Sequence, residues 1–355
     1  MKNRIRVMVV EDSAVVRELL CHIIGEDPRF EVVAAVDSAE AALANLDAVR
    51  PDVITLDIRL PGMNGLEATL QIMARRPTPI VVVSANVESD ELNIAMNALR
   101  AGALTVVEKP VGVTDEDYGV IADDLRNQLA IMSQVKVLRQ VRRRPLSFGP
   151  ARDDEPAFAG PPPSPLIQPE VLGIVASTGG PNALSVLLGG LGADFPLPII
   201  VVQHITPSFN EGFAAWLRDV VRLPVSVARD GDEVVPGQVH LPPADHHLRF
   251  SKGRLFLDRG PPVSNQRPSG TKLFASLAGE LGNRAVGVLL TGMGNDGAEG
   301  LLAMRRAGAF TIVEDKSTAV IFGMPEAALR LGAAAETLPL PMIAARVREI
   351  VGDPI

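Results

Sequence analysis

The chain has 355 residues, of which 47% are hydrophobic, and this length and composition predict two globular domains with buried cores. Its net charge of −8 at pH 7 disfavours general binding to nucleic acid or to anionic membranes, and its single cysteine, Cys21, excludes an internal disulfide and a multi-cysteine zinc site. The N-terminal apolar run is too short for a signal peptide or a membrane span, so we expect a cytoplasmic protein without membrane insertion.

The first third of the chain alternates short apolar runs with segments of helical periodicity. The apolar runs predict buried parallel strands at Ile5–Val10, Glu31–Val36, Val53–Leu56, Ile80–Val83 and Thr105–Val107. This βα rhythm is typical of a doubly wound α/β sheet, whose ligands bind at the carboxyl ends of the strands. Polar residues at those ends are therefore candidates for function.

Such residues occur after four of the predicted strands: Glu11 and Asp12 after the first, Asp57 after the third, Ser84 after the fourth and Lys109 after the fifth. Three carboxylates at one rim would repel one another without a cation, and Mg²⁺ suits oxygen ligands with open positions. Asp57 is then the predicted acceptor of a phosphoryl group, with the metal and Lys109 neutralising charge and Ser84 bonding a phosphoryl oxygen. Each residue alone also fits a helix cap or a loop, but their joint placement favours the phosphoryl site.

These residues carry a resemblance to a known family. The matching positions are Glu11-Asp12, Asp57, Ser84, Lys109-Pro110 and the segment DVITLDIRLPGMNGLEA. Together they resemble a response-regulator receiver domain, which implies a flavodoxin-like fold, a metal site of Glu11, Asp12 and Asp57, and phosphorylation of Asp57 by a histidine kinase. Arg59 and Asn64 depart from the Glu and Asp that are more usual there, and these departures bear on the rate and lifetime of phosphorylation.

The middle of the chain changes composition. Residues 117–144 carry apolar side chains at helical spacing, which predicts one amphipathic helix or two end to end. After the cluster Arg142-Arg143-Arg144, a stretch rich in proline, glycine and charge extends to Pro169 and predicts a linker. The arginines fit either a steering site for an acidic partner or the solvated end of a helix. We therefore place a receiver domain at residues 3–125, a helical and Pro-rich linker at 126–169 and a second domain at 170–352.

The second domain resumes the βα alternation. Apolar runs predict strands at Val171–Val175, Leu197–Val202, Val286–Leu290 and Phe310–Val313, and residues 225–257 predict a hairpin-like region. After the first of these strands, the turn ASTGGP places Ser177 before a predicted helix. A glycine-rich turn fits a structural or phosphate-binding role as well as an exposed nucleophile, so the choice depends on partners elsewhere in the chain.

Ser177, His204 and Asp296 each follow a predicted strand, so a parallel sheet would gather them at one rim. A histidine can take the proton of a serine, and a buried carboxylate can orient that histidine, which makes these residues a predicted catalytic triad. The backbone amides of Thr178 and Met293 are the predicted oxyanion hole, because glycines in the later loop permit close approach. His204 alone also fits a core histidine, and Asp296 alone fits the N-cap of the following helix.

A second resemblance extends over about residues 171–350. The ordered blocks that carry it are ASTGGP, QHITPSF, DGDEVVPG, LLTGMGNDGAEGL and FGMPEAA. They resemble the catalytic domain of chemotaxis-type protein-glutamate methylesterases, which implies a Rossmann-like fold and the triad Ser177, His204 and Asp296. The implied reaction is cofactor-independent hydrolysis of glutamate methyl esters on chemoreceptors, often with deamidation of glutamine. The sequence departs from the family at Val175, where glycine is usual, at Gln266, where histidine is frequent, and at Gly270-Thr271, where Val-Asp is usual.

We therefore expect two doubly wound parallel-sheet α/β domains joined by a Pro-rich linker and acting as a phosphorylation-gated serine hydrolase. The resemblance implies that the unphosphorylated receiver covers the catalytic rim and that phosphorylation of Asp57 uncovers it. Two rival hypotheses remain open. One is a receptor-docking adaptor whose hydrolase-like domain has little activity, and the other is an esterase of the same mechanism that acts on a non-chemotaxis receptor array.

Overall fold

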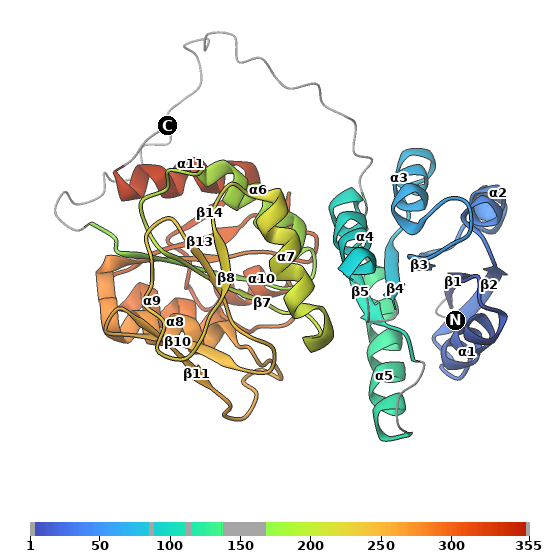
Figure 1. The fold of residues 1–355 in the computed structure, drawn as a ribbon, viewed down its shortest axis with the longest axis horizontal. Coiled ribbons are helices and arrows are strands. Elements are labelled where there is room, and N and C mark those ends of the chain that lie inside the picture. The colour runs from blue at the N-terminus through green and yellow to red at the C-terminus, as the bar shows by residue number, and fades with distance from the viewer. Residues whose placement is uncertain (1–3, 85–88, 111–114, 136, 138–167, 353–355) are drawn as a thin grey trace, which may run out of the picture.

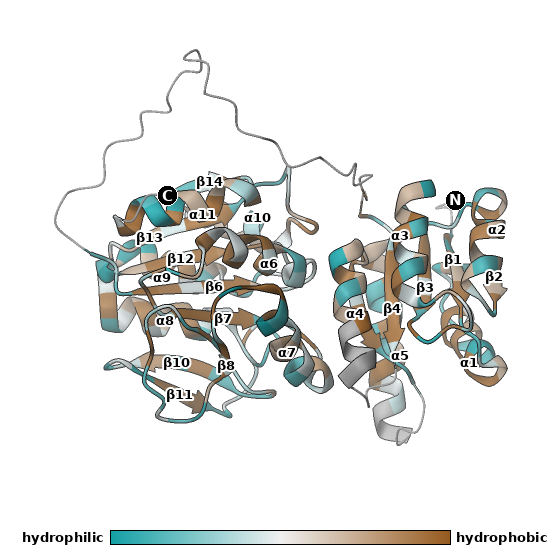
Figure 2. Ribbon diagram, turned by 45° about the horizontal axis from the view of Figure 1, so that its top comes forward, coloured by the Kyte–Doolittle hydropathy of each residue, from teal (hydrophilic) through white to brown (hydrophobic). Residues whose placement is uncertain are grey.

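The structure is a computed structural model that describes residues 4–84, 89–110, 115–135, 137 and 168–352. These residues form two α/β domains, coloured blue to teal and green to red in Figure 1. Hydrophobic residues concentrate in the strands of both sheets and on the helix faces that cover them (Figure 2). Within the described residues, none of the helices combines the length and the apolar character needed to cross a bilayer.

The N-terminal domain is built on a five-stranded sheet in the order β2-β1-β3-β4-β5, with every pairing parallel. Its elements are β1 (Ile5–Val10), α1 (Ala14–Gly25), β2 (Phe30–Val36), α2 (Ala39–Val49), β3 (Val53–Asp57), α3 (Gly65–Arg75), β4 (Ile80–Ser84), α4 (Ser89–Ala101), β5 (Thr105–Glu108) and α5 (Asp115–Met132). The strand order is that of the flavodoxin-like fold, as predicted. β3 and β4 are buried along their whole length, which explains their continuous apolar runs.

The C-terminal domain is built on a seven-stranded parallel sheet in the order β14-β13-β12-β6-β7-β9-β8. Its strands are β6 (Val171–Ala176), β7 (Ile199–Gln203), β8 (Val225–Val227), β9 (Val239–Leu241), β12 (Ala285–Leu289), β13 (Phe310–Glu314) and β14 (Glu336–Leu338). Its helices are α6 (Gly180–Leu191), α7 (Asn210–Val220), α8 (Gly270–Leu281), α9 (Ala298–Arg306), α10 (Gly323–Arg330) and α11 (Leu340–Val351), with short 3₁₀ turns at Pro207–Phe209 and Gly282–Arg284. Two parallel-sheet α/β domains confirm the predicted fold class.

The prediction of a hairpin-like region at residues 225–257 is correct only in its second half. β10 (His247–Ser251) and β11 (Arg254–Asp258) form an antiparallel hairpin, whereas β8 and β9 pair in parallel and extend the main sheet. The residues between β8 and β9 return the chain to the end of the sheet where β8 began. Turn residues mark each reversal of direction but do not show how many reversals separate two strands.

The sequence predicts one amphipathic helix, or two end to end, over residues 117–144, and α5 accounts for this pattern as far as Met132. The next residues form a turn in which Val135 N donates to Met132 O. Val135 and Val137 still pack against the hydrophobic cores, so the apolar spacing continues although the helix does not. The rest of the predicted helix and linker lies outside the described residues.

The two domains meet along α4, β5 and α5 of the first and α6 and α7 of the second. Trp216 Nε1 on α7 donates a hydrogen bond of 3.2 Å to Asn97 Oδ1 on α4. Ser208 Oγ donates one of 3.3 Å to Glu108 Oε2 at the end of β5. The carboxyl end of β5 therefore touches the second domain directly.

Candidate active site and phosphorylation site

Ser177 lies in the tight turn between β6 and α6. Gly179 in this turn has a φ of +78°, a region that favours glycine, and a Cβ there would lie 2.7 Å from Val320 Cβ. Pro181 follows in the first turn of α6, as predicted. Ser177 N donates a 3.0 Å hydrogen bond to Thr291 O, so the turn is tied to the loop that follows β12.

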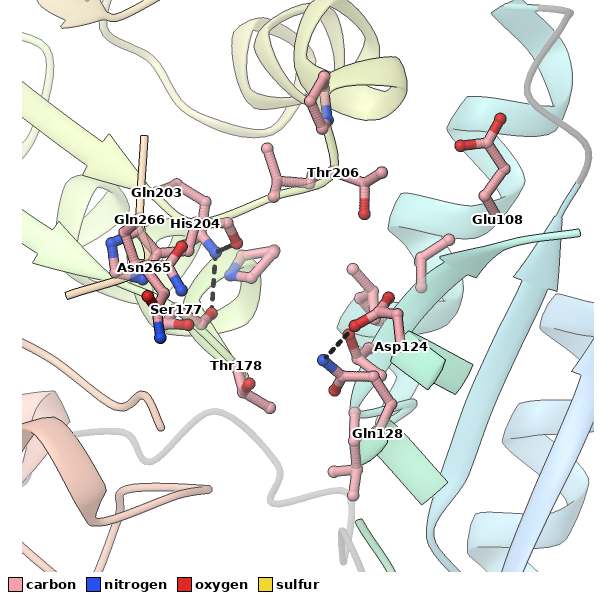
Figure 3. Close-up of a pocket in the computed structure, with 18 of the residues that line it drawn as sticks. Glu108, Asp124, Gln128, Ser177, Thr178, Gln203, His204, Thr206, Asn265 and Gln266 are labelled. Atoms are coloured by element: carbon pink, nitrogen blue, oxygen red, sulfur yellow. Dashed lines mark hydrogen bonds between the residues drawn. The ribbon is translucent and has the colours of Figure 1, made fainter. Parts of the chain in front are cut away.

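Gln203, the last residue of β7, supports both this turn and the neighbouring histidine. Its Nε2 donates to Ser177 O at 2.8 Å and to His204 O at 2.7 Å (Figure 3). A buried amide thus fixes the backbone of two candidate catalytic residues. Gln203 is not among the residues predicted from the sequence, although a polar side chain at the end of an otherwise apolar strand was a signal for it.

His204 and Asp296 form a buried pair, with 2.8 Å between Nε2 and Oδ2. Asp296 also accepts hydrogen bonds from Ser269 Oγ at 2.7 Å, Gly270 N at 2.6 Å and Thr271 N at 3.1 Å. Burial raises the pKa of Asp296, but the hydrogen bonds from His204, Ser269 and Gly270 outweigh it and hold that pKa below its usual value. The carboxylate is therefore ionised and oriented, with His204 as one of four donors.

The alternative reading of Asp296 as the N-cap of the following helix is wrong. The residue that precedes α9 at the N-cap position is Gly297. Asp296 instead accepts from the N-terminal residues of α8, a helix that comes earlier in the chain. The positive end of that helix dipole adds to the stabilisation of the carboxylate.

The other ring nitrogen, His204 Nδ1, is buried and has no hydrogen-bond partner in the described part of the chain. Ser177 and His204 line one cavity, but no hydrogen bond joins Ser177 Oγ to the ring among the described residues. Because Asp296 engages Nε2, Nδ1 is the nitrogen that can take a proton from Ser177.

The loop after β12 comes close to the candidate nucleophile. A Cβ on Gly292 would lie 2.7 Å from Ser177 Cβ, and Gly292 O accepts from Met324 N at 2.8 Å. Within the described residues, the amides of Thr178 and Met293 donate no hydrogen bond. Both amides can therefore serve a developing oxyanion, in keeping with the predicted oxyanion hole.

The candidate active site opens into a cavity of about 520 Å³ between the two domains. Figure 3 shows Ser177 and His204 on one side of this space and Glu108, Asp124 and Gln128 of the N-terminal domain on the other. The N-terminal domain thus stands over the catalytic rim.

Two of the departures from the methylesterase family contact each other. A Cβ on Gly270 would lie 2.3 Å from Val175 Cγ1, so valine on β6 fills the space left by glycine on α8. Beside them, Thr271 Oγ1 accepts from Gly297 N at 2.8 Å. Gln266 lines the interdomain cavity. The exchange of Gly and Val between positions 175 and 270 therefore preserves the packing behind Asp296.

This pairing predicts the outcome of a double-mutant cycle. Gly270→Val alone is expected to lower the free energy of unfolding by about 1–3 kcal/mol, because its side chain overpacks against Val175. Val175→Gly alone leaves a cavity and is expected to cost a similar amount. The double variant should recover most of the loss, giving a coupling energy of about 1–3 kcal/mol in denaturant unfolding. Additive losses would contradict the compensated packing.

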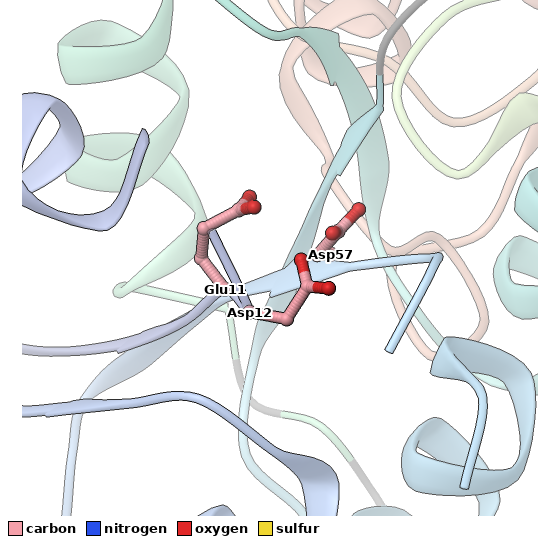
Figure 4. A group of neighbouring side chains, drawn as sticks. All are labelled: Glu11, Asp12 and Asp57. Carbon is pink, nitrogen blue, oxygen red and sulfur yellow. The ribbon is translucent and has the colours of Figure 1, made fainter. Parts of the chain in front are cut away.

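Figure 4 shows the second candidate site, at the carboxyl edge of the N-terminal sheet. The carboxylate oxygens of Glu11, Asp12 and Asp57 lie within 4.8 Å of one another. Lys109 Nζ lies 2.9 Å from Glu11 Oε2 and 2.9 Å from Asp57 Oδ2. The fold therefore brings these four sequence-predicted residues together.

The electrostatics of this group fit a divalent cation. Burial raises the pKa of Glu11, and the charge of Asp57 raises it further; burial also raises the pKa of Asp57. Lys109 opposes both shifts but is a single positive charge. Glu11 Oε2 and Asp57 Oδ2 are both buried and both contact the single ammonium group of Lys109. Oxygen ligands of this kind, with excess negative charge, suit Mg²⁺.

The remaining predicted residues of this site take supporting positions. Ser84 is buried at the end of β4, and its carbonyl accepts from Lys109 N at 3.0 Å. Arg59 N donates to Asp57 Oδ1 at 3.3 Å, so this departure contributes through its backbone. Asn64, the other departure, caps the N-terminus of α3 with its side chain.

Comparisons with known proteins agree with this geometry. The response regulator receiver domain family matches residues 7–116, and the CheB methylesterase family matches residues 172–347. The chain is 60% identical over 353 residues to protein-glutamate methylesterase/protein-glutamine glutaminase 2 of Paramagnetospirillum magneticum, covering 99% of this chain and 98% of that protein. It is 43% identical over 351 residues to protein-glutamate methylesterase/protein-glutamine glutaminase 1 of Syntrophus aciditrophicus, covering 98% and 99% respectively. The crystal structure of the Thermotoga maritima CheB methylesterase catalytic domain matches with a TM-score of 0.50 at 36% identity, covering 52% of this chain and 100% of that one.

Proposed function

The chain belongs to the CheB methylesterase family, and from this membership we propose that it is a phosphorylation-activated protein-glutamate methylesterase and protein-glutamine glutaminase. Its proposed substrates are methylated chemoreceptors, its phosphoryl donor is a histidine kinase, and it acts in the cytoplasm. The observation that carries the proposal is the buried His204–Asp296 pair beside Ser177, in a cavity that the receiver domain covers.

In the proposed mechanism, Ser177 Oγ attacks the side-chain carbonyl carbon of a glutamate methyl ester. His204 Nδ1 takes the hydroxyl proton, and Asp296 stabilises the imidazolium through Nε2. The amides of Thr178 and Met293 bind the oxyanion. The bond between the carbonyl carbon and the methoxy oxygen then breaks, and that oxygen takes the proton from His204 and leaves as methanol, so that the acyl group stays on Ser177. Water, deprotonated by His204, hydrolyses the acyl-enzyme and frees Ser177; with glutamine as substrate, the leaving group is ammonia.

The receiver site is proposed to control access to this chemistry. Glu11, Asp12 and Asp57 would hold Mg²⁺, which neutralises charge on the phosphoryl group that Asp57 accepts. Lys109, which contacts Asp57, directly follows Glu108, and Glu108 accepts the interdomain hydrogen bond from Ser208. A change of charge at Asp57 alters its contact with Lys109, and Lys109 is bonded directly to Glu108 at the domain interface. Phosphorylation is proposed to favour an arrangement in which the cavity around Ser177 opens.

Asp57→Asn is expected to remove activation. Methanol release from methylated receptor membranes should rise about 5- to 150-fold in the wild type when acetyl phosphate and Mg²⁺ are added, the usual range for a coupling of 1–3 kcal/mol. The Asp57→Asn protein should show no such rise, because it lacks the phosphoryl acceptor. Asp37→Asn, at an exposed aspartate of the same domain, is the control and should respond like the wild type. A normal response of Asp57→Asn would refute phosphorylation gating.

The departures from the family at Val175 and at Gly270 are sequence features that favour the adaptor hypothesis. Since Val175 packs against Gly270, and Gly270 N still donates to Asp296, these departures leave the catalytic geometry intact. A non-chemotaxis receptor array would use the same mechanism. A panel of methylated receptors in the methanol assay distinguishes that array from chemoreceptors.

A further inference from the structure

A buried carboxyl group that takes no part in the proposed chemistry lies behind the active site. Glu314 is the last residue of β13 and is 0% exposed. Its Oε2 accepts a 2.7 Å hydrogen bond from Thr291 N, and its Oε1 is buried as well. Burial raises the pKa of Glu314 to about 7.

Thr291 connects this carboxyl group to the nucleophile turn. Thr291 O accepts from Ser177 N at 3.0 Å, and Thr291 Oγ1 donates to Thr178 O at 2.9 Å. The same hydroxyl accepts from Ile321 N at 2.9 Å. One threonine thus contacts the backbone of the proposed nucleophile and of a proposed oxyanion-hole residue.

Thr291 N needs a side-chain acceptor because it lies just beyond the paired part of β12. The pairing of β12 with β13 ends at Leu289 and Val313, and the next amide, Leu290 N, donates to Val175 O of β6 at 2.9 Å. Thr291 N lies one residue beyond and is also buried, so it needs an acceptor from another source. The carboxyl group of Glu314, at the end of the adjacent strand, supplies it.

We propose that Glu314 is a positioning residue for ester hydrolysis, which fixes Thr291 and, through it, the backbone of Ser177 and Thr178. This inference rests on the proposed role of Ser177 as nucleophile. Without the acceptor, the buried Thr291 N–H would be unsatisfied, and the segment after β12 would shift relative to the nucleophile turn. Displacements of about 1 Å at a reacting group can cost about 10²-fold in rate.

The protonation state of Glu314 depends more on burial and hydrogen bonding than on neighbouring charges. Asp315, next in the chain, raises its pKa, and the hydroxyl of Thr318 lowers it. β12 faces it with apolar residues only, whereas Glu336 on β14 is paired with Arg346 at 2.6 Å. None of the ion pairs in the described part of the chain involves Glu314. A glutamine at this position would keep the acceptor for Thr291 N.

Two substitutions of Glu314 test this role. The assay is methanol release by the phosphorylated full chain on methylated receptor membranes. Glu314→Leu is expected to lower kcat by roughly 10- to 100-fold, with KM within about twofold of the wild type. Glu314→Gln should stay within about threefold in kcat, because the acceptor is retained.

Thr311→Val is the matched control. Thr311 is equally buried on β13, but its hydroxyl bonds Ala333 O and Ala335 N, away from the active site. This variant should lose stability and keep kcat, which separates positioning from a purely structural effect. A Glu314→Leu protein with normal kcat, or a Glu314→Gln protein as impaired as Glu314→Leu, would overturn the inference. Wild-type activity that persists in Ser177→Ala would instead refute the proposed function.

If Glu314→Leu does not fold, amide resonances provide the test. The signals of Thr291 and Ser177 should shift together in the wild type as the pH passes about 7, the pKa of Glu314. In Glu314→Gln this shared component should be absent. Identical titrations of both amides in the two proteins would overturn the inference.

Discussion

Replacing Ser177 with alanine is expected to lower methyl ester hydrolysis by roughly 10³- to 10⁶-fold, because no acyl-enzyme can form. Its hydroxyl makes no hydrogen bond to other described residues, so the variant should melt at the temperature of the wild type. Methanol release with acetyl phosphate and Mg²⁺ measures the loss, and thermal unfolding checks the fold.

Ser185→Ala provides the control for this change. Ser185 lies on α6, a short distance along the chain, and its hydroxyl donates to the carbonyl of Asn182 at 2.8 Å. This variant should hydrolyse the ester at the wild-type rate. More than a tenth of the activity remaining in Ser177→Ala would show that another group is the nucleophile. A wild type that binds receptors but releases no methanol would support the adaptor hypothesis.

Asp296→Asn is expected to lower the rate by about 10³- to 10⁴-fold. Asp296 accepts from four donors, His204 Nε2, Ser269 Oγ, Gly270 N and Thr271 N. An asparagine has one acceptor oxygen, and whichever way its amide is turned, its NH₂ group faces a backbone N–H. Either orientation therefore leaves a backbone donor of α8 unsatisfied, and one of the two also loses the hydrogen bond from His204.

Asp296→Asn is also expected to lower the free energy of unfolding. Each unsatisfied buried donor costs about 1–3 kcal/mol, which denaturant unfolding can measure. Asp258→Asn is the control, since Asp258 also accepts a backbone N–H, that of Gly260, but lies outside the active site. It should keep its rate of ester hydrolysis. An Asp296→Asn protein with near-normal kcat would remove Asp296 from the triad.

Several features of this protein were determined by its sequence. Apolar runs of strand length, each followed by a polar residue, predicted both sheets and the rims at which function would lie. Glu11, Asp57 and Lys109 are far apart in the chain, yet each follows or ends a strand, and the carboxyl ends of parallel strands share one edge. The same reasoning brought His204 to the rim where Ser177 lies.

Only the tertiary structure decided which side chains meet across that rim. Asp296 takes two of its donors from the start of α8, 25 and 26 residues earlier in the chain, and Glu314 reaches Thr291 from the adjacent strand. The sequence pattern likewise did not show that Val175 and Gly270 share one space or that the receiver covers the cavity. Periodicity and turn chemistry are local, whereas these contacts depend on strand order, on the number of chain reversals and on how two domains pack.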